Sequence, residues 1–112
     1  MSDIQMITDA LVKFRDDRQW AQFHDSKNLA LAISIEAAEL NELFLWKDGT
    51  AAEEMNRDRL REELADIFSF CFLLADKHKL NAKEIVMDKI RLNNEKYPIE
   101  KAKGTAKKYN EL

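Results

Sequence analysis

Apolar residues recur at steps of three and four along most of the chain, which is the period of one face of an α-helix. The first such stretch contains Ile4, Ile7, Leu11 and Phe14, and it predicts a helix from about Ile4 to Gln19. Only 2 Gly and 1 Pro occur in the sequence, too few for the turns that many short strands would need. The pattern therefore predicts a helical protein.

Two longer helices are expected in the middle of the chain. The second helix begins after Asp25 and Ser26, either of which can cap it, and runs to about Lys47, where Asp48-Gly49 supplies a C-terminal stop. The segment Thr50-Ala-Ala-Glu53 has the form of a capping box. The third helix is thus expected to begin there or, after a break, near Asp58, and to end at about His78.

A fourth helix is expected between Asn81, an acceptable N-cap, and Pro98, which ends it within a residue or two. The tail from 99 to 112 contains four lysines around Gly104 and is expected to be irregular. These expectations add up to an all-α, four-helix bundle that forms a single domain over residues 1–112.

Length and charge exclude several classes of protein. The chain has 112 residues and a formal net charge of −3, which argues against a nucleic-acid binder because such a protein needs a basic face. No apolar run is long enough to span a membrane, and no basic region leads into a hydrophobic one, so we expect neither a membrane segment nor a signal peptide. The single cysteine, Cys71, fits a reducing compartment, and we expect a cytoplasmic protein.

Acidic residues on the second helix face the apolar side. Each residue advances a helix by about 100°, which puts Glu36 about 20° from Leu29, within the stripe that Ile33 and Leu40 continue. Glu39 falls at the edge of the same stripe. An ionised carboxylate that faces a core is costly unless a cation or hydrogen bonds compensate it.

The third helix repeats this arrangement, with Glu63 among Leu60 and Ile67 and with Asp66 near Phe70. Two such helices packed together bring four carboxylates into one patch, where divalent cations would neutralise their repulsion. An all-oxygen ligand set suits Mg²⁺, with Mn²⁺ as the other candidate, and no histidine follows a glutamate by three residues as a di-iron bundle requires. The alternative, two solvent-exposed acidic pairs without a metal, remains open.

One face of the fourth helix carries Lys89, Asn93 and Lys96, flanked by apolar residues. Two ammonium groups and an amide on one face can hold phosphates opposite a metal cluster. The alternative is that the lysine stems cover hydrophobic surface.

Aromatic residues lie close to the acidic pairs in the sequence. Trp20, Trp46 and Phe70 can stack a nucleotide base, with His24 supplying a hydrogen bond. Ordinary core packing is the competing interpretation of these residues.

The run from Ile67 to Ala75 has no charged residue and is apolar nearly all round the helix. A helix of that kind is buried on several sides, and a chain of this size can hardly cover it alone. We therefore expect a homo-oligomer, either a dimer or a tetramer, with Cys71 as a core thiol.

Together these residues resemble the MazG-like nucleoside triphosphate pyrophosphohydrolases of the all-α superfamily, and in particular the short single-domain dCTP pyrophosphatase type. The resemblance spans Arg15 to Leu112 and includes the tail, with Lys96-Tyr97-Pro98 and the lysines that follow. Its other motifs are Arg18-Gln-Trp20-x-x-Phe23-His24-x-x-Lys27-Asn28-Leu29, Glu36-Ala-Ala-Glu39-Leu-x-Glu42-x-Phe44-x-Trp46 and Glu62-Glu63-Leu-Ala-Asp66-Ile67.

The resemblance implies a tetrameric, Mg²⁺-dependent enzyme with sites between subunits. It implies that the metal is bound by Glu36, Glu39, Glu63 and Asp66. It implies that the base is bound by Trp20, His24, Trp46 and Phe70. The phosphate side is then expected to involve Asn28, Lys89, Asn93, Lys96 and Tyr97.

The functional hypothesis is hydrolysis of (deoxy)nucleoside triphosphates, with dCTP or related pyrimidine nucleotides as substrates, to the monophosphate and pyrophosphate, as a nucleotide-pool house-cleaning activity. Either Glu39 or Glu36 is expected to accept the proton of the attacking water. Two alternatives remain open: a non-catalytic helical interaction module, and a nucleotide or metal sensor that binds without turnover.

Overall fold

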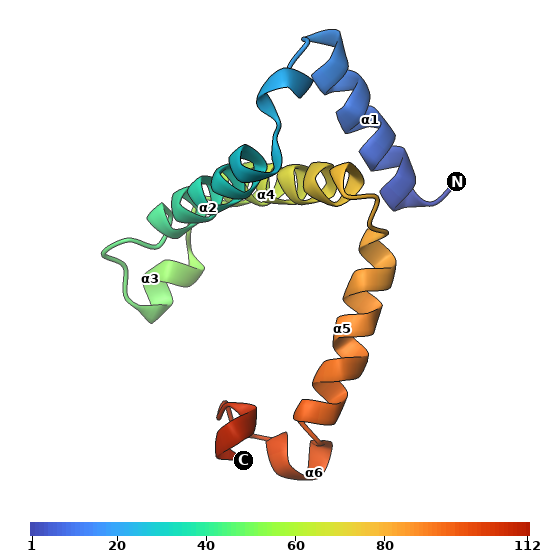
Figure 1. The fold of residues 1–112 in the computed structure, drawn as a ribbon. Helices are drawn as coiled ribbons and strands as arrows, with labels where there is room; N and C mark the ends of the chain where they lie inside the picture. The colour runs from blue at the N-terminus through green and yellow to red at the C-terminus, as the bar shows by residue number, and fades with distance from the viewer. The chain divides into compact units, whose positions relative to one another are not determined.

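The computed structural model describes all 112 residues, and every regular element in it is helical (Figure 1). The all-α prediction is confirmed. By contacts the chain divides into two compact units, unit 1 from Met1 to Lys79 and unit 2 from Leu80 to Leu112. The elements are α1 (Asp3–Asp17), η1 (Ala21–Phe23), α2 (Ser26–Glu42), α3 (Gly49–Glu53), α4 (Arg57–Lys77), α5 (Ala82–Lys96), α6 (Ile99–Ala102) and η2 (Tyr109–Glu111).

Unit 1 is built around α2 and α4, which lie side by side and run in opposite directions (Figure 1). Their shared core contains Leu29 and Leu73, and Leu43 is buried just after α2. The start of α2 is tied to the end of α4 by a hydrogen bond of 2.8 Å between Ser26 Oγ and His78 Nε2. Helix α1 packs against α4. The antiparallel pairing places the middle of α2 opposite the first half of α4.

The helices α1 to α5 begin at residues whose side chains cap the free backbone N–H groups. Asp25 accepts from the Asn28 N–H at 2.7 Å at the start of α2, and Asn56 accepts from the Arg59 N–H at 3.1 Å at the start of α4. Asn81 caps α5, as the sequence predicts. These caps fix where the two helices that carry the acidic pairs begin.

The second helix is shorter than predicted, because α2 ends at Glu42 and not near Lys47. From Leu43 to Leu45 the backbone N–H groups bond three residues back, in the tighter 3₁₀ manner. Trp46 then takes a left-handed conformation with φ 65°. The helix is thus replaced by successive turns that keep Leu43 buried. Helix α1 also ends early, at Asp17, and is followed by Gln19 with φ 57°.

The predicted break ahead of the third long helix exists, but the capping differs from the prediction. Asp48, and not Thr50, caps α3, since its Oδ1 accepts from the Ala51 N–H at 2.9 Å. A second helix, α4, then starts behind Asn56. In unit 2, α5 ends close to Pro98 as predicted, whereas the tail is more regular than expected, with α6 and η2.

Helix α4 leaves a large part of its apolar surface uncovered within the chain. Phe68 is 57% exposed, and Cys71, which was expected in the core, is exposed. Within unit 1, α2 and α1 pack against α4, and they cover only part of the helix. Partial burial by its neighbours nevertheless raises the pKa of the Cys71 thiol. None of the helices combines the length and apolar character needed to cross a bilayer.

Unit 2 consists of α5 and a short C-terminal segment that contacts its last turn. The rings of Tyr97 and Tyr109 meet edge to face, with centroids 6.2 Å apart, and Lys96 Nζ lies 5.0 Å from the Tyr109 ring centroid. No side chain of α5 is buried, and Ile85, Val86 and Met87 are among its exposed residues.

Candidate active site

Three of the four predicted metal ligands lie together where α2 faces α4. The carboxylates of Glu36, Glu39 and Glu63 each offer one oxygen, and these oxygens lie within 4.8 Å of one another. Glu63 is buried, with 8% of its surface exposed, and the other two are half-buried. Carboxylates this close repel one another unless a proton or a cation lies between them.

The surroundings of this carboxylate cluster (Glu36, Glu39 and Glu63) compensate its charge only weakly. Glu36 Oε2 and Glu63 Oε2 are buried with no hydrogen-bond partner. The only cation in contact is Arg59, at 3.5 Å from Glu63 Oε1 and itself half exposed. Buried oxygens without partners, in an all-oxygen set of donors, fit a hard divalent cation such as Mg²⁺ or Mn²⁺.

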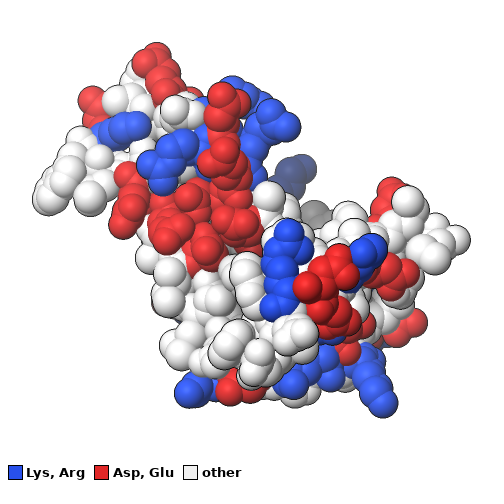
Figure 2. Space-filling view, turned by 90° about the horizontal axis from the view of Figure 1, so that it is seen from above, with Lys and Arg blue, Asp and Glu red and all other residues white.

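The electrostatics of Glu36 lead to the same conclusion. Burial first, and then the neighbouring Glu39 and Asp66, raise the pKa of Glu36 to about 7. A group that is half protonated near neutral pH for these reasons is a normal feature of carboxylates placed to share a cation. Acidic side chains also gather into a broad patch on the face of the molecule that Figure 2 shows.

Asp66, the fourth predicted ligand, lies apart from the cluster and is exposed. Its charge still acts on Glu36. Asp66 also lines a pocket of about 580 Å³ in unit 1. It therefore connects the carboxylates with this cavity.

This cavity, called here the aromatic pocket, lies among α1, η1 and α4 and has a mainly apolar wall. Three of the four predicted base-binding residues, Trp20, His24 and Phe70, line it. The His24 and Phe70 rings meet edge to face at 6.4 Å, and burial followed by the charge of Arg15 lowers the pKa of His24. Sequence reasoning missed the rest of the wall, formed by Ile7, Ala10, Leu11, Phe14, Arg15, Ser69 and Leu73.

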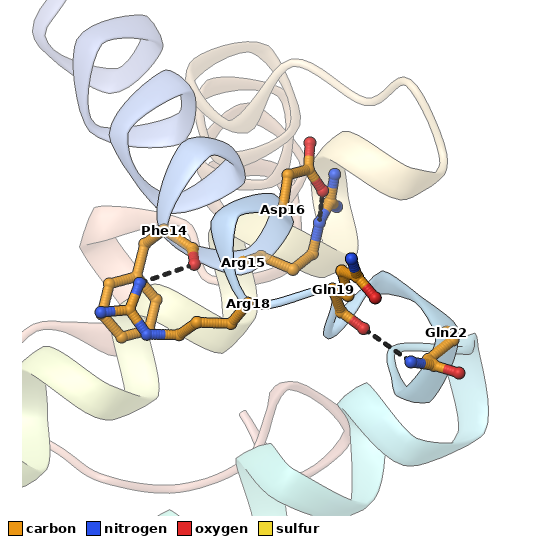
Figure 3. A network of polar contacts seen from close by, with 6 residues as sticks. All are labelled: Phe14, Arg15, Asp16, Arg18, Gln19 and Gln22. Carbon is orange, nitrogen blue, oxygen red and sulfur yellow. Dashed lines mark hydrogen bonds and ion pairs between the residues drawn. The ribbon is translucent and has the colours of Figure 1, made fainter.

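The turn between α1 and η1 holds the pocket wall in place (Figure 3). Arg18 stacks on the Phe14 ring, 3.7 Å from its centroid, and donates to the Phe14 carbonyl at 3.0 Å. Phe14 in turn meets Trp20 edge to face at 5.8 Å. Gln22 donates to the Gln19 carbonyl at 2.9 Å, which closes the turn at its left-handed residue.

Of the other predicted site residues, Trp46 and Asn28 belong to unit 1 and do not line this pocket. Trp46 is 94% exposed and lies outside the pocket wall. The Asn28 amide donates to the Phe23 carbonyl at 3.1 Å, a contact that supports the start of α2. The remaining predicted phosphate-side residues belong to unit 2, where Asn93 and Tyr97 are half-buried and Lys89 and Lys96 are exposed.

An oxygen-only carboxylate cluster between two antiparallel helices, next to an aromatic pocket, has the composition of a cation-dependent nucleotide site. Comparison with known proteins agrees with this class. The MazG-like family model matches residues 31–112, and the chain belongs to the MazG-like family.

Two further comparisons identify similar proteins. The chain is 36% identical over 105 residues to dCTP pyrophosphatase 1 of Mus musculus and equally to that of Homo sapiens, covering 89% of this chain in each case. It spans only 62% of the length of these curated relatives. A crystal structure of a pyrophosphatase from Archaeoglobus fulgidus superposes with a TM-score of 0.82 at 36% identity, over 88% of this chain and 94% of that one.

Proposed function

We propose that this chain is a Mg²⁺-dependent pyrophosphohydrolase that converts (deoxy)nucleoside triphosphates, dCTP or related pyrimidine nucleotides above all, to the monophosphate and pyrophosphate. The observation that carries the proposal is the carboxylate cluster next to the aromatic pocket. Its relatives are named dCTP pyrophosphatase and pyrophosphatase, which supports the same reaction. Removal of excess or damaged nucleotides is the corresponding cellular task.

The residues that would hold the metal are Glu36, Glu39 and Glu63, with Asp66 at the side of the pocket. The two buried oxygens without partners support this role. A divalent cation bound there supplies charge neutralisation for the phosphates and lowers the pKa of a bound water. Mn²⁺ meets the same donor set.

The chain's own residues accept the proton of the water and bind the base and the phosphates. Glu39 or Glu36 accepts the proton of the attacking water, whose oxygen adds to phosphorus while the bond to the departing pyrophosphate breaks. Trp20, His24 and Phe70 stack and orient the base, and we assign Trp46 to the same task. We assign the phosphate contacts to Asn28, Lys89, Asn93, Lys96 and Tyr97.

A nucleotide panel tests the proposal directly. Canonical dNTPs and NTPs are incubated with Mg²⁺, and pyrophosphate and orthophosphate are scored separately, with EDTA as the control. Pyrophosphate together with monophosphate, both absent in EDTA, is the expected result. Orthophosphate alone would contradict the choice of bond. Binding without turnover by folded protein would favour the sensor, and neither binding nor turnover would favour the non-catalytic interaction module.

Neutral substitutions in the carboxylate cluster give the first mutational prediction. We expect Glu39→Gln and Glu63→Gln each to lower kcat by about 100-fold or more, since each removes a charge that holds the cation or moves the proton. Circular dichroism should show that both variants remain helical. Glu42→Gln, an exposed change at the end of α2, is the matched control and should keep full activity. Full activity in Glu39→Gln or Glu63→Gln would contradict the assignment.

We also propose that the working form is a homo-oligomer in the cytoplasm that does not bind nucleic acid. The uncovered apolar face of α4, with Phe68 57% exposed, supports an assembly. Cys71 is a free thiol, which suits a reducing compartment. The net charge of −3 and the acidic patch in Figure 2 oppose binding to a polyanion.

A further inference from the structure

The aromatic pocket contains few groups that can recognise a base by hydrogen bonding. Its polar wall residues are Arg15, His24, Asp66 and Ser69. The Ser69 hydroxyl already donates to the Ala65 carbonyl at 2.7 Å, and Asp66 is an acidic side chain whose charge acts on Glu36. Arg15 is therefore the one cationic hydrogen-bond donor in the wall.

The side chain of Arg15 has one ion-pair partner, and its backbone carbonyl contacts the pocket wall. Its Nε donates to Asp16 Oδ1 at 2.8 Å, and only 20% of its side chain is exposed (Figure 3). Its carbonyl accepts from the Trp20 N–H at 3.0 Å, which couples it to an aromatic wall residue. Because Nε is already used, the two Nη groups remain to meet a ligand.

His24, which lines the same pocket as Arg15, carries no competing charge. Burial and the Arg15 charge together lower the pKa of His24, so the imidazole is neutral near neutral pH. The wall of the aromatic pocket thus combines uncharged rings with a single guanidinium group.

A guanidinium fork recognises two neighbouring acceptors, because its N–H bonds point in parallel. Among pyrimidines, cytosine offers such a pair in O2 and the unprotonated N3. Uracil and thymine carry a proton on N3, which would face the N–H groups of the fork. Adenine places an amino donor beside its N1 acceptor.

We propose that Arg15 is a specificity-determining residue that selects cytosine over uracil and thymine by bidentate donation to O2 and N3. This inference rests on the proposed function, since it presumes that the aromatic pocket receives the base. Asp16 acts as a positioning residue, because its ion pair sets the direction of the fork. A substituent on the C5 carbon of cytosine lies on the opposite side of the ring and leaves this recognition unchanged.

The test compares kcat/KM for dCTP, dUTP and dTTP in the wild type, in Arg15→Gln and in Arg15→Lys. We expect the wild type to prefer dCTP by about tenfold or more, as a bidentate contact provides, and Arg15→Gln to lose most of that preference. Arg15→Lys keeps the positive charge but not the two parallel donors, so this variant should lose the preference for dCTP as well. Lys13→Gln, an exposed change on the same helix, should leave the ratio unchanged.

A changed ratio separates recognition from a structural role, which would lower the rates for all three nucleotides equally. An unchanged ratio in Arg15→Gln and Arg15→Lys, or a loss of kcat/KM that is equal for dCTP, dUTP and dTTP, would overturn the inference. Calorimetric measurement of dCMP and dUMP binding tests the role of Arg15 separately from the proposed hydrolysis. Preferential dCMP binding that is lost in Arg15→Gln supports the role of Arg15 even if the wild type hydrolyses nothing. If wild-type protein binds neither monophosphate, or binds both alike, the inference fails.

Discussion

Glu36 carries a stability cost that depends on pH. Its pKa is about 7 in the folded chain, against an ordinary value of 4.5, so the folded state holds its proton more tightly than the unfolded state does. The free energy of unfolding of the metal-free protein therefore falls as pH rises from about 4.5 to about 7. A bound cation removes this cost, since it replaces the proton as the partner of the carboxylates.

Glu36→Gln should remove this cost and raise the melting temperature of the metal-free protein. Thermal denaturation in EDTA at about pH 8 is expected to show an increase of several degrees, because 1 kcal/mol corresponds to about 4–8 °C in a domain of this size. The increase should disappear at about pH 4, where the wild-type residue is protonated in both states. Equal melting temperatures for the variant and the wild type at both pH values would contradict the prediction.

Some site residues could be predicted from the sequence and others could not. The 100° step of a helix predicts that Glu36 and Glu63 face apolar neighbours, and the structure places both in the carboxylate cluster. Arg15 follows Leu11 by four residues, so it shares a helix face with the apolar stripe, but the polar run around it concealed this. The exposure of Asp66 depends on how α1 and α2 cover α4, which helical phase alone does not specify.

Helix α2 carries two members of the carboxylate cluster, so its N-terminal cap matters for the site. Asp25 Oδ1 accepts from the Asn28 N–H at 2.7 Å, and Asp25→Ala leaves that donor without a partner. We expect a loss of about 0.5–2 kcal/mol in the free energy of unfolding, measured by denaturant titration. Asp25→Asn preserves the acceptor and should cost much less. Similar losses in the two variants would show that the cap is not the cause.

The ends of the helices were harder to predict than the helices themselves. Apolar residues continue past Glu42 at helical spacing, which is why the sequence predicts α2 to reach Lys47. The structure instead tightens into 3₁₀ turns there and reverses direction at Trp46. The burial of Leu43 against the rest of unit 1 decides this, and it is a tertiary effect that a local pattern does not contain.

At the scale of the whole molecule, unit 1 exposes several large apolar side chains. Only Leu29, Leu43 and Leu73 are buried apolar residues, whereas Leu31, Ile35 and Phe68 are more than half exposed. Exposed apolar side chains in this number favour an interface with another molecule.

We expect assembly into a dimer or a tetramer of the 13.1-kDa chain. Light scattering coupled to size-exclusion chromatography measures the mass directly. Phe68→Lys should shift the distribution towards monomer, because it places a charge on the uncovered face of α4. A wild-type mass of one chain at every concentration would contradict the prediction.

The two tryptophans allow ligand binding and assembly to be followed by intrinsic fluorescence. Trp20 lines the aromatic pocket and rests against Phe14, so its emission should respond when a base stacks beside it. Trp46 is 94% exposed in the single chain, so its emission maximum should lie to the red and move to the blue if assembly covers it. The single-tryptophan variants Trp46→Phe and Trp20→Phe therefore report separately on the aromatic pocket and on the surroundings of Trp46 without any added label.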